Sequence, residues 1–199
     1  MAFEPFGKIA RLNRDVIISE KLDGTNALVE IGQWPNGRDV ELPDQENIIA
    51  SANGLFMLAG SRTRYITPGK TTDNFGFAAW VQTNADQLWT LGPGKHYGEW
   101  FGQGIQRGYG LKEKRFALFN VSRWTDAAVR PACCHVVPTL LTGPFTTEMT
   151  NMAVAMLRLN GSYAVSAFTP AEGIVIYHTA SKQLYKVTLD GDGVPKSRR

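Results

Sequence analysis

The stretch VIISEKLDGTNALVEI, residues 16–31, contains two apolar runs that are typical of buried β-strands, separated by the polar segment EKLDGTN, residues 20–26. Asp23-Gly24 by itself predicts a simple hairpin turn. A lysine held between two strands, however, is partly desolvated, and desolvation favours the neutral, nucleophilic form of an amine. The segment therefore admits two interpretations, an ordinary turn or a reactive Lys21.

Composition is that of a folded protein without membrane spans. The chain has 199 residues, 43% of them hydrophobic and 20% charged, which is enough to bury a core in one domain. No apolar run reaches the length of a membrane helix, and the N-terminus lacks a signal-peptide pattern. Cys133 and Cys134 are adjacent, which is poor geometry for a disulfide between them. We therefore expect reduced thiols and a cytoplasmic location.

Hydrophobic periodicity predicts an α+β domain dominated by antiparallel strands. Two segments have helical spacing: residues 71–89, with Asp73 as N-cap, and residues 147–159, with Gly161 as the stop. Residues 35–60 and 102–111 are rich in Gly, Asn and Gln and are expected to be loops. Apolar residues alternate in the segments that we expect to be strands, namely 16–19, 27–31, 96–100, 116–121, 134–139, 173–178 and 183–189.

The net charge is only +3, but the basic residues are clustered. Such clusters either converge on one face that attracts a polyanion or lie in solvated loops. Charge by itself favours the solvated loops. The clusters are Lys8, Arg11 and Arg14; Arg62, Arg64 and Lys70; Arg107, Lys112, Lys114 and Arg115; and Lys196, Arg198 and Arg199.

Four further segments place charged or aromatic side chains at strand ends. HYGEWFG carries Glu99, RFALFNV carries Phe119, AEGIVIYH carries Glu172 and QLYKV carries Lys186. An aromatic ring stacks a base, carboxylates hold a divalent metal or ribose hydroxyls, and lysines neutralise phosphates. This set of side chains is what a nucleotide site needs.

The segments EKLDGTN, GEWFG, FNV, EGIVI and LYKV resemble motifs I, III, IIIa, IV and V of the covalent nucleotidyltransferase superfamily, in the same order and rough spacing. The superfamily comprises ATP-dependent DNA ligases, RNA ligases and mRNA capping enzymes. Asn26 matches the Gly-Thr-Asn ending of RNA ligases similar to the phage double-strand-sealing type. Arg62, in SRTR, falls where those ligases carry an essential arginine. The resemblance covers residues 20–188 and implies a nucleotidyltransferase fold of ligase type over residues 1–199.

The resemblance implies an ATP-dependent RNA ligase that joins 3′-hydroxyl and 5′-phosphate ends. Lys21 would take AMP from ATP, pass it to the 5′ end, and the 3′-hydroxyl would then displace it. RNA ends, with a nicked duplex as the leading substrate, would be the partner of a monomeric enzyme in RNA repair. Lys21 lies too near the start for the N-terminal domain of NAD-dependent ligases, and the 13 residues after Lys186 are too few for an OB domain.

The resemblance also implies roles for single residues. Phe119 would stack on adenine, Glu99 would bind the ribose hydroxyls, and Glu172 would bind Mg²⁺ or Mn²⁺. Lys186 would contact the α-phosphate. The remaining roles are orientation of AMP and the nucleic-acid ends by Arg62 and Asn26, and an adenine contact by Glu20.

Two positions depart from the motifs. Motif V usually holds a second basic residue where this chain has Thr188, and the closest RNA ligases often have histidine where it has Asp23. The alternatives are a minimal DNA ligase, a 5′-end adenylyltransferase with weak joining, a non-catalytic nucleic-acid-binding relative, and a regulatory module that binds ATP reversibly.

Overall fold

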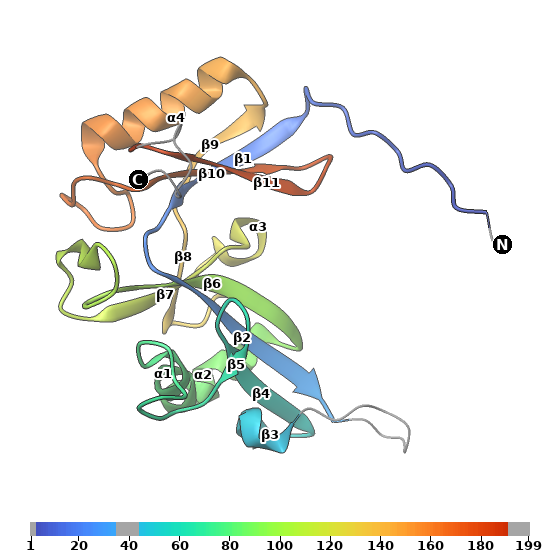
Figure 1. The fold of residues 1–199 in the computed structure, drawn as a ribbon, viewed down its shortest axis with the longest axis vertical. Helices are drawn as coiled ribbons and strands as arrows, with labels where there is room; N and C mark the ends of the chain where they lie inside the picture. Colours follow the sequence, from blue (N-terminus) through green and yellow to red (C-terminus); the bar gives the residue numbers. More distant parts are fainter. Residues whose placement is uncertain (1–2, 35–43, 191–199) are drawn as a thin grey trace. The chain divides into compact units, whose positions relative to one another are not determined.

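The computed structural model describes residues 3–34 and 44–190, and the chain forms two compact units (Figure 1). Unit 1 combines Met1–Lys21 with Pro138–Arg199, and unit 2 is Leu22–Val137. Both are built on mainly antiparallel sheets with helices, so the predicted α+β class is confirmed. The prediction that residues 1–199 act as a single domain stays a prediction, as does everything expected of residues 35–43 and of the basic tail 196–199, which lie outside the described residues.

Unit 1 is a four-stranded antiparallel sheet with one helix on it. The strand order is β11-β10-β1-β9, and the helix α4 packs on one face of the sheet (Figure 1). Buried residues from β1, α4 and β10 form its core, among them Ile18, Leu157 and Ile176. The elements are β1 (Asp15–Lys21), β9 (Thr139–Pro144), α4 (Thr147–Asn160), β10 (Gly173–His178) and β11 (Gln183–Thr188).

Local sequence signals define both ends of α4, and the predicted stop at Gly161 is confirmed. The Thr146 hydroxyl accepts a hydrogen bond from the Met149 N–H at 3.0 Å, which is the geometry of an N-cap. The helix ends at Gly161, whose φ of 75° favours glycine. A Cβ at Gly161 would lie 2.4 Å from the Phe168 carbonyl oxygen, so close packing also requires glycine there.

Glu20 ties β1 to the chain that follows α4. Its Oε2 accepts hydrogen bonds from the Tyr163 N–H at 2.8 Å and the Ala164 N–H at 2.9 Å. The residue is only 1% exposed. Burial raises the pKa of the Glu20 carboxyl above its ordinary value, although hydrogen bonds from Ser162, Ala164 and Tyr163 oppose the rise.

Unit 2 is a seven-stranded sheet with short helices. The order is β3-β4-β2-β6-β7-β8, with β5 paired to β4; β7 and β8 run parallel and the other pairs antiparallel. One face carries the core, in which Phe77 and Trp80 of α1 pack on Trp100 and Phe116. The strands are β2 (Thr25–Gln33), β3 (Ile48–Ala52), β4 (Leu55–Gly60), β5 (Tyr65–Ile66), β6 (Gly94–Gly102), β7 (Lys114–Leu118) and β8 (Cys134–Val136). The helices are α1 (Phe77–Thr83), α2 (Ala85–Leu88), α3 (Val121–Trp124) and the 3-10 turns η1 (Gln45–Asn47), η2 (Trp89–Leu91) and η3 (Gly108–Gly110).

The predicted loop over residues 35–60 was wrong for its second half, which forms the β3–β4 hairpin. Asn53 and Gly54 connect the strands with φ of 51° and 74°. Asn-Gly between apolar runs is the signal of such a turn, because both residues tolerate positive φ. The sequence IIASANGLFMLAG therefore contained the information.

Three predicted boundaries were also wrong. The helix expected from residue 71 begins at Phe77, because Phe75 and Gly76 have φ of 52° and 79°. The N-cap residue is Gly76 and not Asp73, although the Asp73 carboxylate accepts from the Ala78 N–H at 2.8 Å. The strand expected over 116–121 ends at Leu118 and is followed by α3, and the strand expected over 134–139 divides into β8 and the start of β9.

Removal of the Glu20 carboxylate tests its anchoring role. Glu20→Ala removes the acceptor of the Tyr163 N–H and one of the two acceptors of the Ala164 N–H. It should lower the free energy of unfolding by about 1–3 kcal/mol, measured by urea titration. Glu20→Gln keeps an acceptor and should lose much less. Glu148→Ala, at an exposed glutamate of the same unit, is the control and should change little.

The pH dependence gives a second readout for the same residue. A raised carboxyl pKa means that the folded state holds the proton more tightly than the unfolded state. The contribution of Glu20 to stability is therefore complete at low pH and falls as the pH rises past 4.5 and through the folded-state pKa. Glu20→Gln should lack this fall. Identical pH profiles for both proteins would contradict the assignment.

Candidate functional site

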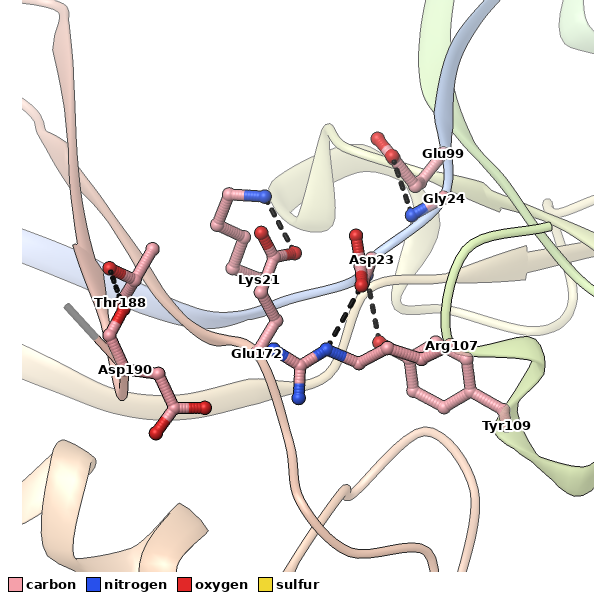
Figure 2. Close-up of polar contacts among 9 residues, drawn as sticks. All are labelled: Lys21, Asp23, Gly24, Glu99, Arg107, Tyr109, Glu172, Thr188 and Asp190. Atoms are coloured by element: carbon pink, nitrogen blue, oxygen red, sulfur yellow. Dashed lines mark hydrogen bonds and ion pairs between the residues drawn. The ribbon is translucent and has the colours of Figure 1, made fainter. Parts of the chain in front are cut away.

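Lys21 is the last residue of β1 and forms an ion pair within unit 1. Its Nζ donates a hydrogen bond to Glu172 Oε2 at 2.7 Å, and the two side chains are only 24% and 17% exposed (Figure 2). Glu172 directly precedes β10, and Lys21 lies opposite Gly173 in the sheet. The structure thus brings together two residues that are 151 positions apart in the sequence.

The strand register places Lys186 and Thr188 on the same face of the unit 1 sheet as Lys21. Lys21, Gly173 and Thr188 form one row across β1, β10 and β11, and Lys186 belongs to the next row with Ser19 and Val175. Rows that are two residues apart along a strand have their side chains on the same face of the sheet. Thr188, the departure from motif V, therefore lies in the row of Lys21, while Lys186 is exposed.

Glu20 lies on the opposite face. Successive residues of a strand alternate between faces, and Glu20 pairs with Ile174, which belongs to the core under α4. Its carboxylate binds the backbone of residues 163–164 instead. The predicted adenine contact of Glu20 stays a prediction. In this structure the Glu20 carboxylate lies on the face opposite Lys21.

In unit 2, four hydrogen bonds hold three consecutive residues of the polar segment. The Asp23 N–H donates to Tyr109 Oη at 2.8 Å, and Arg107 Nε donates to Asp23 Oδ2 at 2.9 Å (Figure 2). The Gly24 N–H donates to Glu99 Oε1 at 3.1 Å. Thr25 Oγ1 accepts from Asn74 Nδ2 at 3.0 Å. We call these contacts the Asp23 clamp.

Close packing makes glycine necessary inside the clamp. A Cβ at Gly24 would lie 2.4 Å from the Trp100 carbonyl oxygen and 2.8 Å from Phe101 Cβ. The Trp100 carbonyl cannot move aside at low cost, because it belongs to the backbone of β6. The glycine of the motif is therefore required by the approach of two chain segments and not only by a turn.

The loop expected over residues 102–111 supplies two residues of the clamp. Tyr109 is 2% exposed, packs edge-on against Phe101 with ring centroids 5.2 Å apart, and has a φ of 53°. Positive φ is strained for an aromatic residue and persists only where surrounding contacts fix it. The fixed contacts here include the hydrogen bond from Asp23. This loop is therefore a built support for the residues after Lys21.

The remaining sequence candidates of unit 2 lie in β2, in β6, directly after β7 and in the turn between β4 and β5. Asn26 and Glu99 are direct partners in the β2–β6 register and share a face of the sheet. Phe119 follows β7, is 40% exposed, and its N–H donates to the Tyr97 carbonyl at 2.9 Å. Arg62 is exposed in the turn closed by the Ser61 N–H and the Arg64 carbonyl.

Sequence reasoning did not find the roles of Asn74, Arg107 and Tyr109. Arg107 was noticed only as part of a basic cluster, and the loop only for its composition. Its glycines, with Gly104, Gly108 and Gly110 all at positive φ, were the signal of a tightly folded loop. Which buried side chain it would present to Asp23 depends on contacts 84 and 86 residues apart.

Metal-ligand clustering is sparse. Within residues 3–34 and 44–190, no group of three or more His, Cys, Asp or Glu side chains is positioned to hold a metal ion. The described helices include none long and apolar enough to cross a membrane.

Comparison with solved structures supports the fold. Three structures of Naegleria gruberi RNA ligase match: a mutant with ATP and Mn (TM-score 0.54, 18% identity, 88% of this chain and 49% of that chain), a mutant with AMP and Mn (0.55, 18%, 89% and 50%), and the enzyme with PPi (0.53, 19%, 88% and 50%). The chain thus spans about half the length of these proteins. Comparison with curated proteins gave no match.

The match to a family model is more specific than these fold similarities. The model described as RNA ligase matches residues 14–188, which include β1, the Asp23 clamp, Glu99, Glu172 and β11. Because this match covers most of the sequence, the chain belongs to the RNA ligase family.

Proposed function

We propose that this protein is an ATP-dependent RNA ligase that joins 3′-hydroxyl and 5′-phosphate ends, with a nicked duplex as the leading substrate. The observation that carries the proposal is Lys21 at the end of β1, in contact with Glu172 at 2.7 Å, inside a sequence that matches the RNA ligase family over residues 14–188. The similar solved structures, which contain ATP with Mn, AMP with Mn, or PPi, support the choice of nucleotide.

The proposed reaction has three phosphoryl-transfer steps. Lys21 Nζ, once its ammonium group has given up a proton to solvent, attacks the α-phosphorus of ATP; a P–N bond forms, the nitrogen loses a second proton, and the bond to pyrophosphate breaks. An oxygen of the 5′-phosphate then attacks the same phosphorus, so that the P–N bond breaks and an adenylated end forms. Finally the 3′-hydroxyl attacks the 5′-phosphorus, loses its proton and displaces AMP. Such steps are catalysed mainly by positioning and by neutralising charge.

In unit 1, Glu172 has two tasks in this proposal. Its hydrogen bond orients the Lys21 amine, and its carboxylate would hold Mg²⁺ or Mn²⁺. One carboxylate fits such an ion, because Mg²⁺ keeps several waters and is usually bound by one or two carboxylates plus substrate phosphates. When bound, the ion stabilises negative charge on phosphate oxygens. Lys186 contacts the α-phosphate.

In unit 2, Phe119 stacks on adenine and Glu99 binds the ribose while its Oε1 keeps the Gly24 N–H. Asn26, paired with Glu99 across the strands, orients AMP. Arg62 binds phosphate at the nucleic-acid end. For Glu20 the buried carboxylate favours an indirect role, since it fixes β1 while Lys21 points to the other face.

The proposal includes a monomeric enzyme that works in the cytoplasm in RNA repair. The cysteines support a reducing compartment, because Cys133 and Cys134 are reduced with sulfur atoms 3.9 Å apart. The single-domain organisation over residues 1–199 belongs to the same proposal.

A second candidate function is a 5′-end adenylyltransferase that joins weakly. Thr188 favours it, because a hydroxyl stands in the row of Lys21 where the resemblance expects a second basic residue. This enzyme would form lysyl-AMP and adenylated ends but accumulate the latter. Product analysis on a nicked RNA duplex separates the two functions.

Formation of the lysine adduct is the first test. After removal of any bound AMP with pyrophosphate, incubation with ATP and Mg²⁺ or Mn²⁺ should add one AMP to the intact mass of the protein. Lys21→Ala should give no adduct, and Lys112→Ala, at an exposed lysine of unit 2, should behave as wild type. Folded wild-type protein that gains no mass with either metal would rule out the proposed chemistry.

The Asp23 clamp gives a second test. Tyr109→Phe removes the acceptor of the Asp23 N–H, and Arg107→Ala removes the partner of its carboxylate. Because small displacements of positioned groups can cost up to about a hundredfold in rate, each variant should slow adduct formation by roughly tenfold or more. The rate is followed by the incorporation of labelled AMP.

Arg115→Ala is the control for the clamp, since Arg115 pairs with the exposed Glu113 at 2.6 Å in the same unit. It should leave the rate unchanged. Melting temperatures separate positioning from unfolding. If Tyr109→Phe and Arg107→Ala form the adduct at the wild-type rate, the clamp has no part in lysine adenylylation.

A further inference from the structure

One face of the unit 2 sheet carries a continuous row of residues that begins and ends with aromatic rings. The register pairs Tyr65 with Gly60, Gly60 with Leu28, and Leu28 with Tyr97. Phe119 continues the row, because its N–H binds the Tyr97 carbonyl at 2.9 Å. We call these five residues, from β5, β4, β2, β6 and the position after β7, the aromatic row (strands in Figure 1).

The row lies on the face opposite the core. Ala27 and Val29, which flank Leu28 in β2, belong to the buried cluster with the short helices, whereas Leu28 does not. The hydrogen bond from Tyr65 Oη to Glu30 Oε2 at 2.7 Å confirms that Tyr65 points to this same open face, since Glu30 follows Leu28 by two residues.

The rings of the row are accessible and lie around a low floor. Tyr65, Tyr97 and Phe119 are 37%, 46% and 40% exposed. Between Tyr65 and Tyr97 stand Gly60, which has no side chain, and Leu28, which is 6% exposed. A Cβ at Gly60 would lie 3.2 Å from Leu28. Flat rings beside a low apolar floor suit flat ligands.

Positive charges flank the row. Arg62 and Arg64 are exposed in the turn that joins β4 to β5, and Lys95 lies in the adjacent row, with a side chain 54% exposed. Glu30, the acidic residue of that row, contacts both Tyr65 and Lys95. Aromatic rings edged by cations are the combination that single-stranded nucleic acid requires, because bases stack and phosphates need neutralising.

We propose that Tyr97, with Tyr65 and the floor between them, is a second nucleobase site, which stacks unpaired bases of the nucleic-acid end beside the adenine on Phe119. The inference rests on the proposed function for the ligand on Phe119. The bases must be unpaired, because those inside a duplex offer no ring face to a side chain. The site widens the substrate class from nicked duplexes to single-stranded or overhanging ends.

Binding of a single-stranded RNA to pre-adenylylated protein tests the site, since AMP then already occupies the position on Phe119. A fluorescent oligoadenylate of about ten nucleotides, within the range that such grooves cover, serves as the probe for anisotropy. Tyr97→Ala should raise Kd about tenfold, Tyr65→Ala should also raise it, and Tyr97→Phe should stay near wild type. Quenching of 2-aminopurine in the same strand should be lost with Tyr97→Ala.

Tyr185→Ala is the matched control, at a tyrosine of unit 1 that is 54% exposed, and should not change Kd. A blunt RNA duplex should bind equally to wild type and Tyr97→Ala. Unchanged Kd in both Tyr97→Ala and Tyr65→Ala would overturn the site. So would loss of the AMP adduct in Tyr97→Ala, which would assign Tyr97 to the ATP site.

Failure of the proposed function has a different signature. Wild-type protein would then form no AMP adduct, and the anisotropy series would be run on the unmodified protein. A Tyr97-dependent Kd in that series would support a base-stacking surface in a protein that is not a ligase. A Kd that is unchanged in Tyr97→Ala would then overturn the second nucleobase site as well as the ligase function.

Discussion

The alternation of side chains along β1 is the constraint on which the candidate chemistry depends. Residues of a strand point to opposite faces in turn, so the carboxylate of Glu20 and the amine of Lys21 cannot share a face. The backbone N–H groups of residues 163–164 hold Glu20 on the α4 side. Lys21 is thereby directed to the other face, where Glu172 meets it. A slip of one residue in the β1–β10 register would exchange the two side chains and turn Lys21 toward the core under α4.

In unit 2, side-chain hydrogen bonds position the residues that follow Lys21 and Leu22. Asp23 and Gly24 precede β2, and Thr25 is its first residue. Side chains from β6, the η3 loop and the residues before α1 supply hydrogen bonds to these three residues. Such a segment is ordered only as well as its supports are. The buried Tyr109 packs on Phe101 and makes the support of Asp23 rigid, and Gly24 packs closely against the Trp100 carbonyl.

Much of this arrangement could be predicted from the sequence, because the relevant signals are local. The periodicity of residues 16–31 predicted strands, the helical spacing of residues 147–159 with Gly161 as the stop predicted α4, and the order of the motif segments predicted the family. The β3–β4 hairpin was missed although Asn53-Gly54 signals it. The late start of α1 depends on Phe75, whose positive φ is held by tertiary contacts: its carbonyl accepts from Lys114 Nζ at 2.7 Å. Arg107 and Tyr109 were missed for the same reason, since their partner is distant in sequence.

The discontinuity of unit 1 has a consequence for the order in which the chain can mature. Unit 2 is contiguous, whereas β1 pairs with strands that begin at residues 139 and 173. Chains are made from the N-terminus, and contiguous units fold as they emerge. During synthesis Lys21 therefore has neither its complete sheet nor Glu172 as a partner until the β10 segment has left the ribosome. The Lys21–Glu172 ion pair therefore forms only after unit 2 and most of the described chain have been translated.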